Sequence, residues 1–170
     1  MKTLIDEAAL QARVKEVARD IRKDAGDDAI LLLGVLKGAF MFMADLMRQI
    51  GGDVTCDFIA VSSYVGTTSS GEVQIKKDVD SPLEGRTVII VEDIVDTGLT
   101  LQYLQGILQK RNPKSLRTAC LLSKPSRRKA KVPVDYIGFE IEDKFVVGYG
   151  LDFNERYRNL PYIGLVEGVS

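Results

Sequence analysis

The sequence predicts an α/β protein in which a doubly wound, mainly parallel sheet is flanked by helices. Short all-apolar runs, at 29–36 and 87–91, are typical of strands buried on both faces of a parallel sheet. These runs alternate with segments in which apolar residues recur at helical spacing, as parallel strand–helix–strand units require. No repeat, low-complexity tract or linker divides the 170 residues, so we expect a single domain over residues 1–170.

The helices and strands follow from this pattern in chain order. The helices are expected at residues 4–24, 38–50 and 100–110, the first ended by Gly26 and the second by the Gly51-Gly52 pair. The strands are expected at 29–36, 54–62, 87–91, 116–122, 136–139 and 145–149. Residues 63–81 lose the apolar periodicity and are rich in Gly, Ser and Thr, which predicts a long loop running into a short strand.

Composition excludes several classes of protein. The net charge of −1 gives no general attraction to nucleic acid or to anionic membranes. No apolar run is long enough to span a bilayer, and the first residues contain no signal-peptide core. We therefore expect a cytoplasmic protein without a nucleic-acid or membrane partner.

The chain contains no histidine, and this absence restricts its chemistry. Ser-His-Asp and Cys-His nucleophile systems and HExxH zinc sites are excluded. Proton transfer must use a carboxylate, Lys, Tyr or Cys. A metal site would consist mainly of oxygen ligands, which favours Mg²⁺, Mn²⁺ or Ca²⁺ over zinc.

Acidic and hydroxyl residues crowd the chain behind the strand expected at 87–91. Glu92 and Asp93 follow it directly, then Asp96 to Gly98, and a helix is expected from Thr100. Ligands of open parallel sheets bind beyond the carboxyl ends of the strands, and N–H groups at a helix start suit a phosphate. The adjacent acids suit sugar hydroxyls or a hydrated Mg²⁺ instead. Three acids in five residues exceed what capping of a helix requires.

This segment, EDIVDTGLT, resembles the phosphoribosyl-pyrophosphate signature of the type I phosphoribosyltransferases. The resemblance implies that Glu92 and Asp93 hold the ribose hydroxyls, directly or through Mg²⁺. It also implies that the fold carries a small hood formed by terminal segments. The residues it assigns to a cradle for the 5′-phosphate are Asp96, Thr97, Gly98 and Thr100.

Three more segments are similar to the hypoxanthine-guanine branch of this family. Lys37 and Gly38 stand where that branch has a pyrophosphate loop, in which a cis peptide often precedes the lysine. Ser63 and Tyr64 stand where it has a flexible loop that keeps water from the activated ribose. Lys124 follows an apolar strand, and a lysine so placed in the 6-oxopurine enzymes donates to the purine O6. The basic residues behind it are expected to form a solvated loop: Arg127, Arg128, Lys129 and Lys131.

The stretch from Gly138 to Gly164 is closely similar to the carboxyl-terminal region of the same branch, above all in DKFVVGYGLD. This similarity implies that Phe145 stacks on the purine and that Val146 pairs with its edge through main-chain atoms. It further implies that Asp152 helps to bind a second Mg²⁺ and that Arg158 contacts pyrophosphate. The residue types agree, since an aromatic face suits a base and a guanidinium suits an anion.

Together the resemblances imply a Mg²⁺-dependent enzyme of purine salvage. It would join hypoxanthine and/or guanine to phosphoribosyl pyrophosphate, giving IMP or GMP, the nucleoside 5′-monophosphates, and pyrophosphate. Asp96 is the expected catalytic base for the proton at purine N7, and a homodimer or homotetramer is expected. Lys124 argues against adenine and pyrimidine bases. Xanthine as the base remains an alternative, and so does an RNA-binding regulator on the same fold, which Asp96 and the net charge of −1 disfavour.

Overall fold

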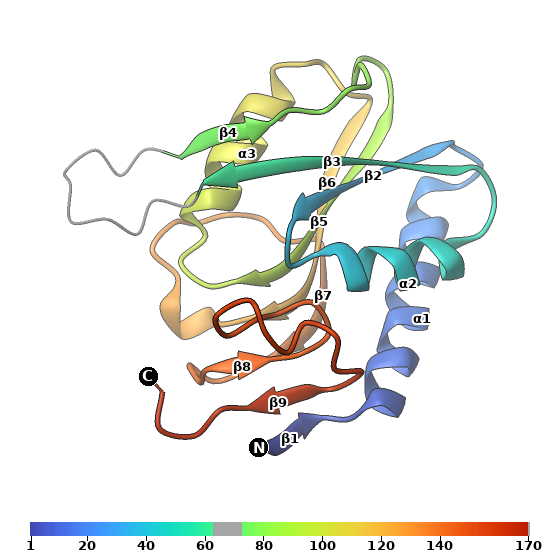
Figure 1. Cartoon of the computed structure of the whole chain (residues 1–170). Coiled ribbons are helices and arrows are strands. Elements are labelled where there is room, and N and C mark those ends of the chain that lie inside the picture. Colours follow the sequence, from blue (N-terminus) through green and yellow to red (C-terminus); the bar gives the residue numbers. More distant parts are fainter. Residues whose placement is uncertain (63–72, 170) are drawn as a thin grey trace.

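The computed structural model of the chain describes residues 1–62 and 73–169 (Figure 1). Its centre is a six-stranded sheet with the strand order β4-β3-β2-β5-β6-β7. Neighbouring strands are parallel except for β3 and β4, which are antiparallel. The strands are β2 (Ile30–Leu36), β3 (Val54–Ser62), β4 (Gln74–Lys77), β5 (Thr87–Val95), β6 (Ser115–Ser123) and β7 (Tyr136–Glu140). The predicted α/β class with a mainly parallel sheet is therefore confirmed.

Helices cover both faces of this sheet (Figure 1). The helices α1 (Glu7–Ala25) and α2 (Phe40–Ile50) pack over one face in a cluster that includes Leu32 and Ile89 of the strands. The helix α3 (Leu99–Gln109) packs over the other face in a second cluster with Leu33 and Ile90. Successive strand residues point to opposite faces, so a sheet covered twice needs strands that are apolar throughout. Among the helices of the described residues, none combines the length and apolarity that a bilayer crossing requires.

A small sheet built from both ends of the chain lies apart from the large one (Figure 1). Its order is β1-β9-β8, with β1 (Lys2–Ile5) and β8 (Val146–Val147) both antiparallel to β9 (Ile163–Leu165). The two ends of the chain therefore lie near each other. This sheet corresponds to the hood of terminal segments that the family resemblance implies.

Several predicted element boundaries were wrong, above all near the two ends of the chain. The helix expected from residue 4 begins at Glu7, because Leu4 belongs to β1, whose partner β9 lies at the far end of the chain. The carboxylate of Asp6 accepts the N–H of Ala9 at 2.8 Å and caps the helix instead. At the carboxyl end, the strand expected over 145–149 is limited to β8, and β9 was not predicted at all.

The strand expected to end at Val91 continues to Val95. It continues because Ile94 and Val95 pair with Leu122 and Ser123 of β6. Glu92 and Asp93 therefore lie within β5 and not behind it. Strand geometry fixes both side chains more firmly than a loop would.

The connections of the large sheet create a crevice at its centre. The chain leaves β2 through α2 towards β3 on one side, and it leaves the adjacent β5 through α3 towards β6 on the other. Two neighbouring strands whose connections diverge leave an open space beyond their carboxyl ends. Such switch points are where open α/β sheets bind their ligands.

Candidate active site

A cleft of about 310 Å³ opens at this switch point, at the carboxyl ends of β2, β3 and β5. Its walls come from four separate parts of the chain: residues 35–38, Val61 of β3, most of 92–101, and the pair Asp152 and Arg158. The fold thereby brings together most of the residues predicted from sequence to form a site. The predicted residues that line the cleft are Lys37, Gly38, Glu92, Asp93, Asp96, Thr97, Gly98, Thr100, Asp152 and Arg158.

The loop from β5 to α3 offers donors to an anion. Asp96 turns one carboxylate oxygen back onto the N–H of Thr97 at 2.6 Å. Gly98 has a φ of 81°, and a Cβ there would lie 2.8 Å from Cγ1 of Val132. Gly98, at the start of the helix that follows, has no side chain to cap it, and Oγ1 of Thr97 accepts the N–H of Leu99 at 3.4 Å. The N–H groups of Thr100 and Leu101 have no side-chain acceptor among the described residues, which leaves them for a bound ligand.

Two acidic side chains form the floor of the cleft. Glu92 is buried, and its burial together with the charge of the adjacent Asp93 raises its pKa well above the usual value. Burial also raises the pKa of Asp93 from 3.8 to about 6, although the N–H of Ile94 and the charge of Arg158 act in the opposite direction. The folded chain thus leaves this carboxylate pair in need of hydroxyl donors or a cation.

Two glycines allow the walls of the cleft to meet. A Cβ on Gly38 would lie 1.7 Å from Oδ2 of Asp93. A Cβ on Gly150 would lie 2.2 Å from the carbonyl oxygen of Gly38. Glycine at these positions therefore brings the end of β2, the acidic floor and the carboxyl-terminal segment into contact. The peptide bond between Leu36 and Lys37 is cis, as in the family pattern.

The cations of the cleft converge on one carboxylate, that of Glu155. Nζ of Lys37 lies 3.0 Å from Oε2 of Glu155, and Nη2 of Arg158 lies 3.1 Å from Oε1. These two cations lower the pKa of Glu155. Arg158 is also held by the carbonyl oxygen of Gly150 at 2.7 Å and lies 3.5 Å from Asp152. Its buried Nε has no acceptor among the described residues.

The acids of the cleft suit Mg²⁺ in a particular way. Among the described residues, no three of His, Cys, Asp or Glu gather closely enough to hold a metal ion by themselves. Mg²⁺ is commonly held by one or two carboxylates and otherwise by substrate phosphates and water. The oxygen donors of Glu92, Asp93 and Asp152 fit that manner of binding.

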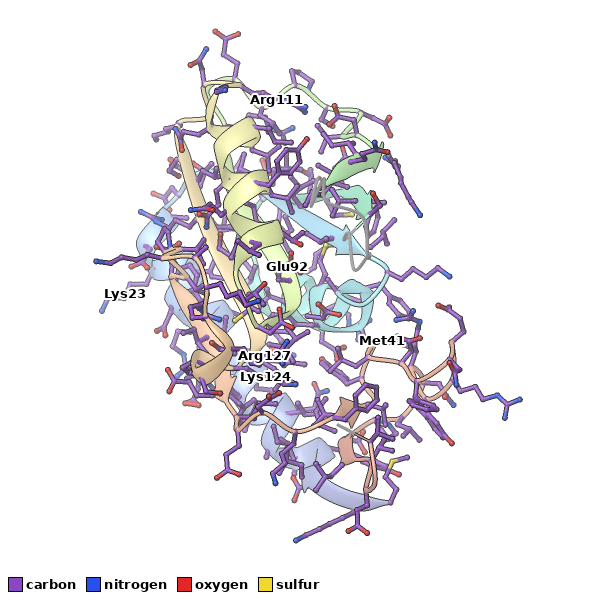
Figure 2. All side chains as sticks on the ribbon, turned by 90° about the vertical axis from the view of Figure 1, so that its left-hand side faces the viewer. Lys23, Met41, Glu92, Arg111, Lys124 and Arg127 are labelled. Atoms are coloured by element: carbon purple, nitrogen blue, oxygen red, sulfur yellow. The ribbon has the colours of Figure 1, made fainter. Side chains whose placement is uncertain are left out.

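We call the three predicted base-binding residues, Lys124, Phe145 and Val146, the base group. None of them lines the cleft, but the main-chain N–H of Lys124 donates to Val95 in its wall at 2.9 Å. Figure 2 shows Lys124 and Arg127 below Glu92 in that view. The ammonium of Lys124 lies 3.4 Å from Asp143. Phe145 packs edge-to-face against Phe153, with the ring centroids 5.4 Å apart.

Arg128 is a site residue whose role the sequence did not indicate, and its assignment to a solvated loop was wrong. Its guanidinium donates to the carbonyl oxygens of Asp96 at 2.8 Å and Val95 at 3.0 Å, and to Oγ of Ser123 at 2.8 Å. It thus braces the start of the loop from β5 to α3, which we call the phosphate loop after its predicted ligand. Its neighbour Arg127 is exposed, and nothing in the basic run distinguishes the two. Glu155 was also missed, while Ser63 and Tyr64 lie outside the described residues.

Comparisons with known proteins agree with this geometry. Residues 2–154 match the phosphoribosyl transferase domain family. The chain is 52% identical over 167 residues to the hypoxanthine-guanine phosphoribosyltransferase of Bacillus subtilis, covering 98% of this chain and 93% of that protein.

Solved structures give the same result. A hypoxanthine-guanine phosphoribosyltransferase from Bacillus anthracis superimposes with a TM-score of 0.94 at 48% identity, covering 98% of both chains. The hypoxanthine phosphoribosyltransferase of Trypanosoma cruzi, in complex with its product IMP, has a TM-score of 0.91 at 42% identity, covering 99% of this chain and 95% of that one. The chain therefore belongs to the phosphoribosyltransferase family, within its hypoxanthine(-guanine) branch, whose enzymes serve purine salvage.

Proposed function

We propose that this protein transfers the 5-phosphoribosyl group from phosphoribosyl pyrophosphate to hypoxanthine and/or guanine. The observation that carries the proposal is the convergence of an acidic floor, a phosphate loop and two cations in one cleft at the sheet's switch point. Each of these parts suits a different portion of phosphoribosyl pyrophosphate. The IMP complex of the Trypanosoma cruzi relative supports the same product class.

The ribose 5-phosphate portion would occupy the centre of the cleft. The loop from Asp96 to Thr100 supplies main-chain N–H groups and two hydroxyls for the 5′-phosphate, and Gly98 allows its close approach. The carboxylates of Glu92 and Asp93 would accept hydrogen bonds from the ribose hydroxyls. Such contacts fix the ribose ring while its reacting carbon exchanges one bond for another.

The pyrophosphate portion would lie between Lys37, the main chain of Gly38 and Arg158. As the bond from ribose to pyrophosphate breaks, negative charge grows on the leaving group, and these residues are placed to stabilise it. Mg²⁺ held near Glu92, Asp93 and Asp152 would supply further positive charge to the pyrophosphate. Positive charge on the ribose, as in glycoside cleavage, would be stabilised by the nearby carboxylates.

The base group would hold the purine beside the ribose. Phe145 offers a stacking face, Val146 its main-chain atoms, and Lys124 an ammonium for the 6-oxo group. As the new bond between purine nitrogen and ribose carbon forms, the base loses a proton at N7. Asp96 is the first residue of the loop from Asp96 to Thr100 and lines the cleft, and it is the proposed acceptor of that proton.

Initial rates with each of several free bases test the proposal directly. The assay contains phosphoribosyl pyrophosphate, Mg²⁺ and hypoxanthine, guanine, xanthine, adenine or uracil. We expect turnover with hypoxanthine or guanine and its complete loss in EDTA. Preferred use of xanthine would change the base assigned, and full activity in EDTA would exclude the role of Mg²⁺. Assembly as a dimer or tetramer stays a prediction, which light scattering coupled to gel filtration would test.

A further inference from the structure

Glu155 occupies a position that the proposed reaction does not explain. One of its oxygens contacts Lys37 at 3.0 Å and the other contacts Arg158 at 3.1 Å. A single carboxylate thus bridges both cations proposed to bind pyrophosphate. A carboxylate and a phosphate group accept the same charge-assisted hydrogen bonds from ammonium and guanidinium groups. Glu155 therefore makes the contacts that pyrophosphate oxygens would require.

The local backbone directs Glu155 towards these cations. The N–H of Glu155 donates to Oδ2 of Asp152 at 2.8 Å, which closes a turn on the wall of the cleft. Glu155 has a positive φ of 67°, which is uncommon for a residue of this type, and it follows Asn154 at 52°, where asparagine is often found. The side chain of Glu155 is nevertheless 64% exposed, so nothing packs over it and water can take it up once it leaves the cations.

We propose that Glu155 is an internal anion that orders Lys37 and Arg158 before substrate binds and competes with pyrophosphate for them. This inference rests on the proposed function of the cleft. Binding of phosphoribosyl pyrophosphate would displace the carboxylate into solvent. Its return to the same two cations after transfer would favour release of pyrophosphate. Glu155 is in this view a positioning residue, whose contacts lower the affinity for the leaving group.

The decisive measurement is pyrophosphate binding to the free protein, by calorimetric titration in buffer with Mg²⁺. Glu155→Gln should bind pyrophosphate about threefold to tenfold more tightly than the unmodified protein, because the two ion pairs of Glu155 no longer compete. Kinetically, KM for phosphoribosyl pyrophosphate should fall and product inhibition by pyrophosphate should strengthen, while kcat does not rise. A residue that only supported the fold would weaken binding when replaced.

Two further variants separate the bridging contact from charge alone. Glu84→Gln removes the same charge from an exposed residue in the turn before β5, at the end of that strand opposite to the cleft. This variant should leave the affinity for pyrophosphate unchanged. Glu155→Asp keeps the local charge but shortens the arm that reaches both cations. It should therefore show a smaller gain in affinity in the same direction, and it carries the test if Glu155→Gln does not fold.

The outcomes are distinct. Equal or weaker pyrophosphate binding by Glu155→Gln, or by Glu155→Asp if only that variant folds, would overturn the role of Glu155 while leaving the transferase assignment intact. Equal gains in pyrophosphate affinity in Glu155→Gln and Glu84→Gln would show that the effect comes from net charge alone. That result would also overturn the proposed role of Glu155. Failure of the unmodified protein to bind pyrophosphate or turn over substrate would instead refute the proposed function.

Discussion

The cleft and the base group differ in how the folded chain satisfies their charges. In the cleft, Glu92 and Asp93 are crowded together, and burial raises the pKa of both. In the base group, the ammonium of Lys124 is only 13% exposed, yet it already has a carboxylate partner in Asp143 at 3.4 Å. The two acids of the cleft floor keep an unfavourable environment for their charges until a ligand arrives, whereas Lys124 is paired before it does.

This difference suits the two regions to different contributions, one to the affinity for a ligand and the other to the choice between ligands. An acidic pair whose charges are only partly compensated gains most from binding hydroxyl donors or a cation. Part of the ligand's binding energy then offsets the cost of burying these acids in the fold. A paired lysine loses one contact when it turns to a ligand, so it contributes less to affinity and more to the choice between ligands. Variants of the cleft should therefore change rate and stability, and variants of the base group should change specificity.

The largest effect is expected from Asp96→Asn. Asparagine keeps an oxygen for the N–H of Thr97, so the loop and phosphoribosyl pyrophosphate binding should be preserved. The value of kcat should fall by roughly 10²–10⁴, because a general base is lost from a chain without histidine. Single-turnover rates and a separate titration with phosphoribosyl pyrophosphate measure the two quantities. A kcat within about twofold of the unmodified value, with chemistry rate-limiting, would assign proton transfer to another group.

Lys124→Ala should alter specificity at smaller cost. Use of hypoxanthine and guanine should weaken by about 1.5–3 kcal/mol, the range for a hydrogen bond to a charged group, and discrimination against adenine should shrink. Values of kcat/KM for hypoxanthine and adenine, at saturating phosphoribosyl pyrophosphate, measure both. Arg127→Ala is the matched control, since it also deprives Asp143 of a cation, at 3.6 Å. An unchanged ratio between the two bases in Lys124→Ala would remove Lys124 from base recognition.

The sequence predicted the cleft better than the residues that support it, for a physical reason. Glu92, Asp93 and the phosphate loop are contiguous in the sequence and follow an apolar run. A local sequence pattern is therefore enough to predict that they belong to one site. Arg128 acts through its guanidinium, which contacts carbonyl oxygens at the end of β5. An arginine in the sequence does not indicate which distant main-chain atoms its side chain will contact. Glu155 meets Lys37 only because the close approach of Gly150 to Gly38 brings their segments together.

The fold shows the same division. Strands of the large sheet were predicted well because burial on both faces makes them apolar throughout. The small sheet was largely missed, since β1, β8 and β9 are short and β1 pairs with β9 across the whole length of the chain. Leu4 matched the helical spacing, but its strand pairs with β9, and long-range pairing overrides local periodicity.

Arg128→Ala tests whether the cleft depends on its brace. Loss of the guanidinium leaves the carbonyl oxygen of Asp96 without this donor and that of Val95 with the N–H of Lys124 alone. The value of kcat/KM for phosphoribosyl pyrophosphate should fall by roughly tenfold through misplacement of the loop. Millimolar guanidinium chloride, far below denaturing concentrations, should restore part of the loss. Lys129→Ala is the control, because that side chain is exposed. Equal effects in both variants, or no rescue, would make Arg128 a general structural residue.

The smallest expected effect, on stability, is the sharpest test of the comparison. The carboxyl of Asp93 has a pKa raised from 3.8 to about 6. The folded state therefore holds its proton more tightly than the unfolded state, and this group lowers stability as pH rises through that interval. Asp93→Asn removes the charge and should raise the free energy of unfolding by about 1–2 kcal/mol near pH 8, without Mg²⁺, while activity is lost. Near pH 4 the gain should vanish.

Asp57→Asn provides the control of opposite sign. Burial raises the pKa of Asp57, but the N–H groups of Phe58, Ser81 and Asp80 lower it more, so its pKa lies below the usual value. An acid of this kind contributes stability above its unfolded pKa and loses it as pH falls, so Asp57→Asn should destabilise the protein near neutral pH. Urea unfolding of both variants across pH measures the contrast. If Asp93→Asn also destabilised the protein near pH 8, the acids of the cleft would be satisfied within the folded chain, and the contrast with the base group would fail.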